Sequence, residues 1–273
     1  METYDRVSVT VGFVLLGLVL FLLVDLPSRT FAFAPLGSLL TVQLSKQWLR
    51  ALLTASLAVA GAHSTVSAHP LARSGAQHPG LTAWIAPGLI GLLVPFLLPL
   101  APDLRYWLGG LALAAVVLGG VILLEYYTTD PNAPEYDLAR LAQSVLTYAV
   151  ALAAFVLIYQ SRSRSLVTAT ATSLVSALMA WRMLQGLDAS LRRILLYAAL
   201  VGLVMGQCTW ALNYWRIHAL TGGVLLLLFF YVGLGMAQQH LQALLTRRVA
   251  IEYGAVAAIG LWLVLRFGVW LGI

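Results

Sequence analysis

The chain has 273 residues, of which 61% are hydrophobic and only 10% are charged. Soluble domains are about 45–50% apolar and about 25% charged, so this composition excludes a soluble globular protein. The net charge of +6 comes from fifteen arginines and one lysine, scattered at the ends of apolar blocks, and such scatter excludes a continuous face for binding nucleic acid.

Apolar blocks follow one another along the chain, most of them close to the twenty residues that a helix needs to cross a bilayer. They cover residues 7–24, 48–68, 81–101, 104–127, 139–160, 166–187, 193–215, 219–242 and 250–271. This pattern predicts an all-α, polytopic transmembrane helical bundle in which residues 1–273 form a single transmembrane domain. Because no small-residue cleavage site follows the first block, we expect a retained span and not a signal peptide.

Residues 25–47 separate the first two blocks and contain Pro27, Pro35 and Gly37 among aromatic residues. Prolines and glycine interrupt a spanning helix, whereas aromatic residues favour the membrane surface. We therefore predict an interfacial segment here.

The block at 81–101 contains Pro87, Pro95 and Pro99. Each proline within a helix removes one backbone hydrogen bond, which a neighbouring group must replace inside a membrane. The sequence therefore predicts a kinked helix.

Charge in the loops bears on the orientation, since cytoplasmic loops carry the excess of Lys and Arg. The loop at 128–138 is acidic and the loop at 161–165 is purely basic, which puts the first outside and the second inside. If 166–187 is re-entrant, eleven basic residues lie inside and five outside; if every block crosses, no bias remains. Charge thus favours about eight spans with both termini outside, and nine spans are the alternative. The many Thr and Ser of 166–187 fit a re-entrant segment, but also a spanning helix whose hydroxyls bond to its own carbonyls.

Polar and aromatic residues gather near the ends of three blocks that the eight-span scheme places outside. Gln207, Trp210 and Asn213 recur at helical spacing and share one face. An outer cleft of this kind suits a polar headgroup on a lipid tail, although an ordinary aromatic belt has the same composition. The candidate ligand-binding residues are Glu125, Tyr127, Asp130, Arg140, Gln207, Trp210, Asn213 and Arg216.

Motifs for other chemistry are missing from the sequence. The histidines have no metal-ligand spacing, Cys208 stands alone, and no nucleophile or phosphate-loop motif occurs. We expect no catalytic residues, no metal and no cofactor.

Three segments carry a resemblance to known proteins: residues 125–131, residues 210–215, and Gln238-Gln239-His240 followed by residues 244–248. They resemble a bacterial family of multi-pass membrane proteins with no assigned function. The resemblance implies a bacterial plasma membrane and no particular activity.

We expect a non-enzymatic role in which the protein binds or scaffolds a lipid-like or partner component of the bilayer. The expected partners are membrane lipids, an amphipathic small molecule or other membrane proteins, and not nucleic acid. Two alternatives stay open. One is a transporter or flippase of an amphipathic solute. The other is an intramembrane enzyme acting on a lipid-linked substrate, with Glu125 or Asp130 as acid or base and Arg140 or Arg216 holding a phosphate.

Overall fold

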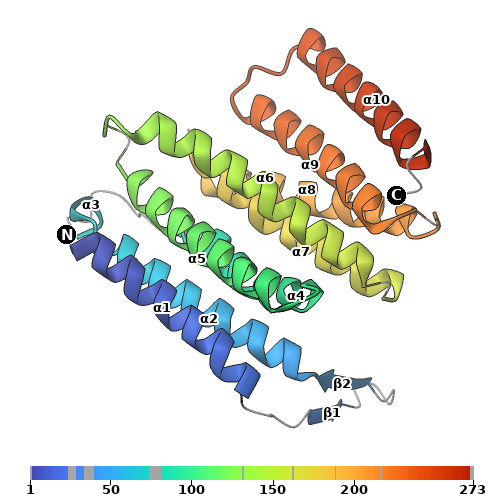
Figure 1. The fold of residues 1–273 in the computed structure, drawn as a ribbon. Helices are drawn as coiled ribbons and strands as arrows, with labels where there is room; N and C mark the ends of the chain where they lie inside the picture. The colour runs from blue at the N-terminus through green and yellow to red at the C-terminus, as the bar shows by residue number, and fades with distance from the viewer. Residues whose placement is uncertain are drawn as a thin grey trace. The chain divides into compact units, whose positions relative to one another are not determined.

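The computed structural model describes residues 2–23, 29–33, 40–73, 81–130, 132–161, 163–187, 189–215 and 217–270. The chain divides into two compact units, residues 1–143 and 144–273, and each is described by itself (Figure 1). The first contains α1 (Glu2–Leu23), β1 (Arg29–Phe33), β2 (Leu40–Leu44), α2 (Lys46–Val66), α3 (Pro70–Arg73), α4 (Ile85–Leu97), the 3-10 turn η2 (Leu98–Leu100) and α5 (Leu104–Tyr127). Helix α6 (Tyr136–Gln160) begins in the first unit and continues into the second, which also contains α7 (Ser165–Leu184), α8 (Leu191–Leu212), α9 (Ala219–Leu241) and α10 (Arg247–Trp270).

Within the described residues, five helices are long and apolar enough to cross a membrane: α5, α6, α7, α8 and α9. Their 20 to 25 residues correspond to about 30–37 Å of helix, which matches the hydrocarbon core of a bilayer. The prediction of a multi-pass helical membrane protein is confirmed, whereas the prediction of eight spans is not.

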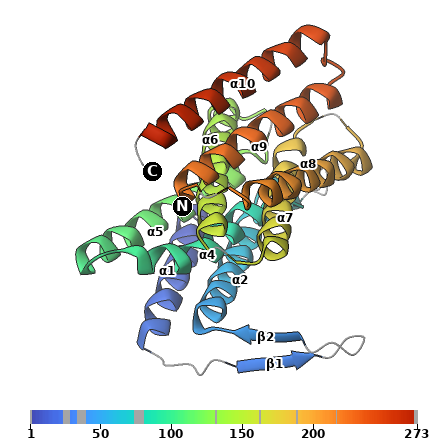
Figure 2. The ribbon, with the colours of Figure 1, turned by 90° about the vertical axis from the view of Figure 1, so that its right-hand side faces the viewer.

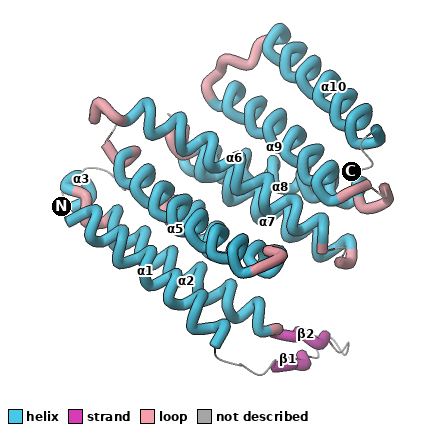
Figure 3. Tube along the Cα trace, in the orientation of Figure 1, coloured by secondary structure: helices cyan, strands magenta, loops and turns pink. Residues whose placement is uncertain are grey.

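The segment predicted to be interfacial contains a β-hairpin, shown in magenta in Figure 3 and extending beyond the start of α2 in Figure 2. Strands β1 and β2 pair antiparallel, with Phe31 opposite Val42. Aromatic and β-branched residues, which favour extended backbone, make up much of both strands. The sequence analysis did not predict this short hairpin, which is an addition to an otherwise helical chain. Pro27, Pro35 and Gly37 lie outside the described residues.

Helix α4 shows the predicted effect of its prolines. Because Pro95 has no N–H, the carbonyl oxygen of Gly91 loses its helical donor, and Pro99 deprives the Pro95 oxygen in the same way. Side chains of α2 replace both bonds: Thr54 Oγ1 donates to the Gly91 oxygen at 2.6 Å, and Gln47 Nε2 to the Pro95 oxygen at 3.3 Å. The helix ends at Leu97 and continues as the 3-10 turn η2.

In the second unit, α7 and α8 form a tightly packed antiparallel pair. A Cβ added at Gly202 would lie 2.6 Å from the Ser173 carbonyl oxygen, and one at Gly206 would overlap the Ser173 hydroxyl. Gly202 and Gly206 are four residues apart, the spacing that lets membrane helices approach closely. Small residues thus set the separation of these two helices.

Helix α9 packs against α8, and α10 packs against α9 in the same unit. Gly222 of α9 lies against the ring of Tyr159 on α6, and Gly235 of α9 against the ring of Tyr253 on α10. Helix α9 ends in a Schellman motif: Leu244 N–H donates to the Gln239 oxygen at 2.9 Å, and Ala243 N–H to the His240 oxygen at 3.1 Å. Ala243 has φ of 56°, a left-handed conformation that favours glycine.

The end of α6 fixes which loops of the second unit lie together. The Tyr159 hydroxyl donates to the carbonyl oxygens of Leu212 at 3.0 Å and Trp215 at 2.9 Å. The start of α7 is tied to the same end of α8, because Asn213 Nδ2 donates to Thr168 Oγ1 at 2.8 Å. The loops before α7 and after α8 therefore lie at one end of the unit.

This arrangement bears on the prediction that 166–187 is re-entrant. In that scheme the loop at 161–165 and the loop after α8 are on opposite faces of the membrane, yet the bonds of Tyr159 bring the two loops together. Helix α7 is also continuous over 20 residues. Both observations favour a complete crossing by α7. Whether α7 crosses the membrane or returns stays a prediction.

Candidate functional site

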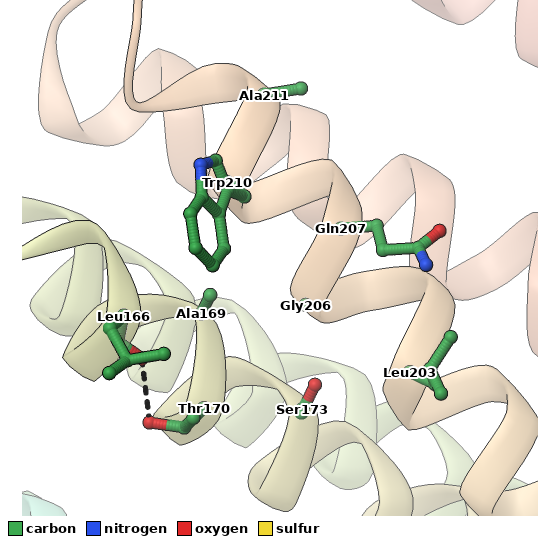
Figure 4. Close-up of a pocket in the computed structure, with 9 residues that line it drawn as sticks. All are labelled: Leu166, Ala169, Thr170, Ser173, Leu203, Gly206, Gln207, Trp210 and Ala211. Carbon is green, nitrogen blue, oxygen red and sulfur yellow. Dashed lines mark hydrogen bonds between the residues drawn. The ribbon is translucent and has the colours of Figure 1, made fainter.

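A groove of about 420 Å³ runs between α7 and α8 on the exposed surface of their pair (Figure 4). Its walls are mainly apolar. The residues that line it are Leu166, Ala169, Thr170, Ser173, Leu203, Gly206, Gln207, Trp210 and Ala211. Its volume falls within the range of about 300–1,000 Å³ that is typical of small-molecule sites.

The floor of the groove is built by the packing of the two helices. Gly206 faces Ala169 and Ser173, and the Ser173 hydroxyl donates to the Gly202 carbonyl oxygen at 2.8 Å. Thr170 donates to the Leu166 carbonyl oxygen at 2.8 Å, the dashed line in Figure 4. Each hydroxyl in the groove therefore donates its proton within the protein, and only its acceptor lone pairs remain for a ligand.

Gln207 differs from these hydroxyls. Its side chain is exposed on α8, and in the described part of the chain it makes no hydrogen bond. Figure 4 shows its amide extending away from Trp210, on the side of Leu203. Gln207 lies about 8 Å from the end of α8 at Leu212, below the level of the loop. Gln207 thus presents its amide on the exposed face of α8, about one helical turn from Trp210.

Trp210 closes the end of the groove nearest the loops. Its side chain is 45% exposed, and its Nε1 donates to the Tyr214 hydroxyl at 3.4 Å. The indole ring extends toward Leu166 and Ala169 of α7 (Figure 4). An aromatic ring with a polar edge near a helix end is typical of the membrane–water interface. The groove therefore runs from an interfacial end at Trp210 to an apolar end at Leu203.

Asn213 lies beyond the groove and does not line it. Its amide nitrogen donates to Thr168, which joins the end of α8 to the start of α7. Gln207 and Trp210 thus share the groove, as their spacing predicts, while Asn213 holds the two helices together. Arg216 lies outside the described residues.

Two other polar side chains of α7 face inward. Thr172 and Ser176 are both 0% exposed, and their hydroxyl oxygens have no hydrogen-bond partner among the described residues. They lie one helical turn apart and continue the face that begins at Thr168. These hydroxyls are part of the buried interface of α7 and not of the groove.

The other predicted residues lie at the end of α5, in the turn that follows it, and near the start of α6. The Tyr127 hydroxyl is 2.9 Å from the Tyr4 hydroxyl, and the Asp130 carboxylate accepts from the Asn132 N–H at 2.9 Å, closing the turn. Glu125 is 3% exposed. Arg140 Nη1 donates to the Tyr136 hydroxyl at 3.4 Å. Tyr127 thus contacts α1, and Asp130 contacts the turn that follows α5.

Helix α6 contains one predicted residue and a tyrosine that contacts the end of α8. Arg140 is near its start, and Tyr159, which bonds to the end of α8, is near its end, about 28 Å further along the helix axis. Glu125, Tyr127 and Asp130 are joined to the start of α6 through the α5–α6 turn. Gln207 and Trp210 belong to α8, and Asn213 is its C-cap residue.

Most residues of the groove were missed in the sequence, because they are apolar or small and resemble any transmembrane surface. The signal that marks them is the pairing of two small-residue patterns, Ala169–Ser173 on α7 and Gly202–Gly206 on α8. Either pattern by itself predicts that its helix packs closely against some neighbour. Only the two patterns together show where α7 and α8 meet. Within the described ranges, no three His, Cys, Asp or Glu side chains gather as a metal site would require.

Comparison with known proteins gives a family but no activity. No curated protein and no solved structure matches the chain. A family model described as "Protein of unknown function (DUF5656)" matches residues 26–267. Because this match covers most of the chain, the protein belongs to the DUF5656 family of unknown function.

Proposed function

We propose that the protein binds an amphipathic, lipid-like molecule in the groove between α7 and α8, and that this role in the membrane is non-enzymatic. The observation that carries the proposal is the exposed amide of Gln207 on a helix long enough to cross the bilayer. Leaving such an amide unpaired in an apolar medium costs roughly 2–7 kcal/mol. A bound molecule with a polar group at that depth removes this cost.

The shape of the groove supports a molecule with one polar end. Trp210 and Gln207 lie toward the loop end, and Leu203 lies about 10 Å deeper than Trp210 along α8. A headgroup would occupy the first position and a hydrocarbon chain the second. The partner in this proposal is therefore a membrane lipid or a related amphipathic compound.

Transport is the main alternative, and it would require the proline-rich helix α4 or the hydroxyl-rich helix α7 to be a broken or mobile element of the bundle. The carbonyls freed by Pro95 and Pro99 bond to side chains of α2. The hydroxyl-rich segment forms the continuous helix α7. Neither observation supports alternating access, so we favour binding over transport. The proposal that Glu125 or Asp130 acts as an acid or base has no observation in its favour.

We further propose that α7 crosses the membrane completely and that the membrane is the plasma membrane of a bacterium. The resemblance of residues 125–131, 210–215 and 238–248 to a bacterial family supports the second proposal. If every apolar block crosses, the termini lie on opposite faces; the arrangement with eight spans and both termini outside requires α7 to return to the face it enters.

Native mass spectrometry combined with lipid analysis tests the binding proposal. Ala211 is exposed and lines the groove, whereas Ala199 is exposed on the same helix but does not line it. Ala211→Trp fills the groove, and Ala199→Trp is the matched control. We expect a specific lipid to copurify with wild type and with Ala199→Trp, and its occupancy to fall about tenfold in Ala211→Trp, a loss of about 1.4 kcal/mol. Equal retention in all three proteins would refute binding in the groove.

A further inference from the structure

We infer that the molecule bound between α7 and α8 is a lipid with an anionic headgroup, recognised at the loop end of the groove. This inference rests on the proposed binding function and specifies its ligand. It follows from the distribution of charge in the second unit and from the way α7 begins.

Carboxylates are absent from the sequence near this end of the groove. Residues 144–273 contain two acidic residues, Asp188 and Glu252. In the sequence Asp188 comes after the C-terminal end of α7 and before the start of α8, and Glu252 is paired with Arg248 at 3.2 Å on α10. No acidic residue occurs within residues 158–181 or 203–218, which include every residue that lines the groove. An anionic group at the loop end therefore meets no carboxylate from these segments.

Positive charge lies at the loop end. Arg164 is the N-cap residue of α7, is exposed, and precedes the groove residue Leu166 by two positions. Its guanidinium can form paired hydrogen bonds with the oxygens of a phosphate. At the membrane–water interface a long side chain of this kind reaches the headgroup level.

The start of α7 offers further donors. Helix α7 has no side-chain cap, and Val167 N–H donates to the Arg164 carbonyl oxygen at 2.8 Å. The N–H groups of Ser165 and Leu166 are the donors that this first turn offers to an acceptor, and the helix dipole gives this end partial positive charge. The C-terminal end of α8 lies at the same place and would oppose an anion. The carbonyl oxygens of Leu212 and Trp215 both lie within hydrogen-bond distance of the Tyr159 hydroxyl. This contact reduces the repulsion between these oxygens and an anion.

These groups are arranged for one orientation of the lipid. Arg164 and the first turn of α7 would bind the headgroup, Gln207 and Trp210 would contact the linkage region, and the apolar end at Leu203 would hold the chain. The absence of acidic residues from the lining segments then gives preference for an anionic over a zwitterionic headgroup.

The test compares two lipids with the same acyl chains. Delipidated protein is titrated with phosphatidylglycerol or with phosphatidylcholine, and each apparent Kd is measured by native mass spectrometry. We expect wild type to bind phosphatidylglycerol about tenfold more tightly, equivalent to about 1.4 kcal/mol. Arg164→Gln should remove this preference. Arg192→Gln, which changes an exposed arginine at the opposite end of α8, should keep it.

Two results would contradict the inference while leaving the binding proposal intact. One is equal affinity of wild type for both lipids, with both weakened by Ala211→Trp. The other is a preference for phosphatidylglycerol that persists in Arg164→Gln. If Ala211→Trp weakens neither lipid, the binding proposal itself fails, and so the two failures are distinguishable.

Discussion

The hydroxyl of Thr54 on α2 donates a 2.6 Å hydrogen bond to the carbonyl oxygen of Gly91 on α4, the oxygen that Pro95 leaves without a helical donor. Thr54 is fully buried, and a Cβ added at Gly91 would lie 2.7 Å from the Thr54 carbonyl oxygen. The three residues therefore act together. Pro95 leaves the Gly91 carbonyl oxygen without a helical donor, and the small Gly91 allows the Thr54 hydroxyl to approach that oxygen.

Thr54→Val should destabilise the protein by about 1–3 kcal/mol, because it leaves the Gly91 oxygen buried without a donor. In a Pro95→Ala background the new N–H can bond to that oxygen, so the same substitution should cost less there. Thermal unfolding in detergent is measured for all four proteins of this double-mutant cycle. It compares the cost of Thr54→Val in the presence of Pro95 with its cost in the Pro95→Ala background.

Thr172→Val is the matched control for that experiment. Thr172 is as deeply buried as Thr54, but its hydroxyl has no partner among the described residues. Its removal should be neutral or stabilising by up to about 1 kcal/mol. If Thr54→Val costs the same with and without Pro95, the account of the proline is wrong.

The close approach of α7 and α8 gives a second prediction. Gly202→Ala brings a methyl group against the backbone of Ser173 and should destabilise the protein by about 1–3 kcal/mol, because backbone atoms cannot rotate away. Gly233 on α9 has open space around its Cβ position, so Gly233→Ala should be neutral or slightly stabilising. Equal unfolding temperatures for the two variants would show that the α7–α8 contact does not depend on glycine.

At the end of α9 we predict a substitution that stabilises the protein. Ala243 occupies the left-handed position of the Schellman motif, where a side chain costs roughly 1 kcal/mol relative to glycine. Ala243→Gly should therefore raise the stability by about that amount, measured by thermal unfolding. Ala237→Gly, in the buried interior of the same helix, should lower it. A loss of stability in Ala243→Gly would argue against the motif.

The contacts of Tyr159 predict which loops share a face of the membrane. In a background without Cys208, single cysteines at Ser163 and Ile217 should react with a membrane-impermeant reagent from the same side, and a cysteine at Ala189 from the opposite side. The eight-span scheme predicts that positions 163 and 217 react from different faces. That labelling pattern would restore a re-entrant α7.

The sequence predicts the membrane class and the effect of the prolines, since both depend on local properties. Which groups replace the lost bonds of Pro95 depends on the packing of α2 against α4, and no spacing in the sequence reveals Thr54 or Gln47 as donors. The hairpin of β1 and β2 was missed because proline, glycine and aromatic residues suit an interfacial segment equally well.

The candidate site was predictable in part. The spacing of Gln207 and Trp210 placed them on one face, and both line the groove. Asn213 fits the same spacing, but its amide bonds to Thr168, a residue far away in the sequence. Loop charge predicts that the α8 residues lie on the same side of the membrane as Glu125 and Arg140, and this stays a prediction. Contacts between distant residues decide such questions, and a single sequence does not contain them.

Photo-crosslinking tests the binding groove most directly. Leu203 and Leu200 lie on the same helix and are 56% and 54% exposed, but only Leu203 lines the groove. The protein is reconstituted with phosphatidylglycerol that carries a photoactivatable group in its acyl chain, and adducts are located by peptide mass spectrometry. A lipid held in the groove predicts much heavier labelling of Leu203 than of Leu200, with the excess lost in Ala211→Trp. Equal labelling of the two leucines would mean that the groove meets only bulk lipid and would contradict the proposed function.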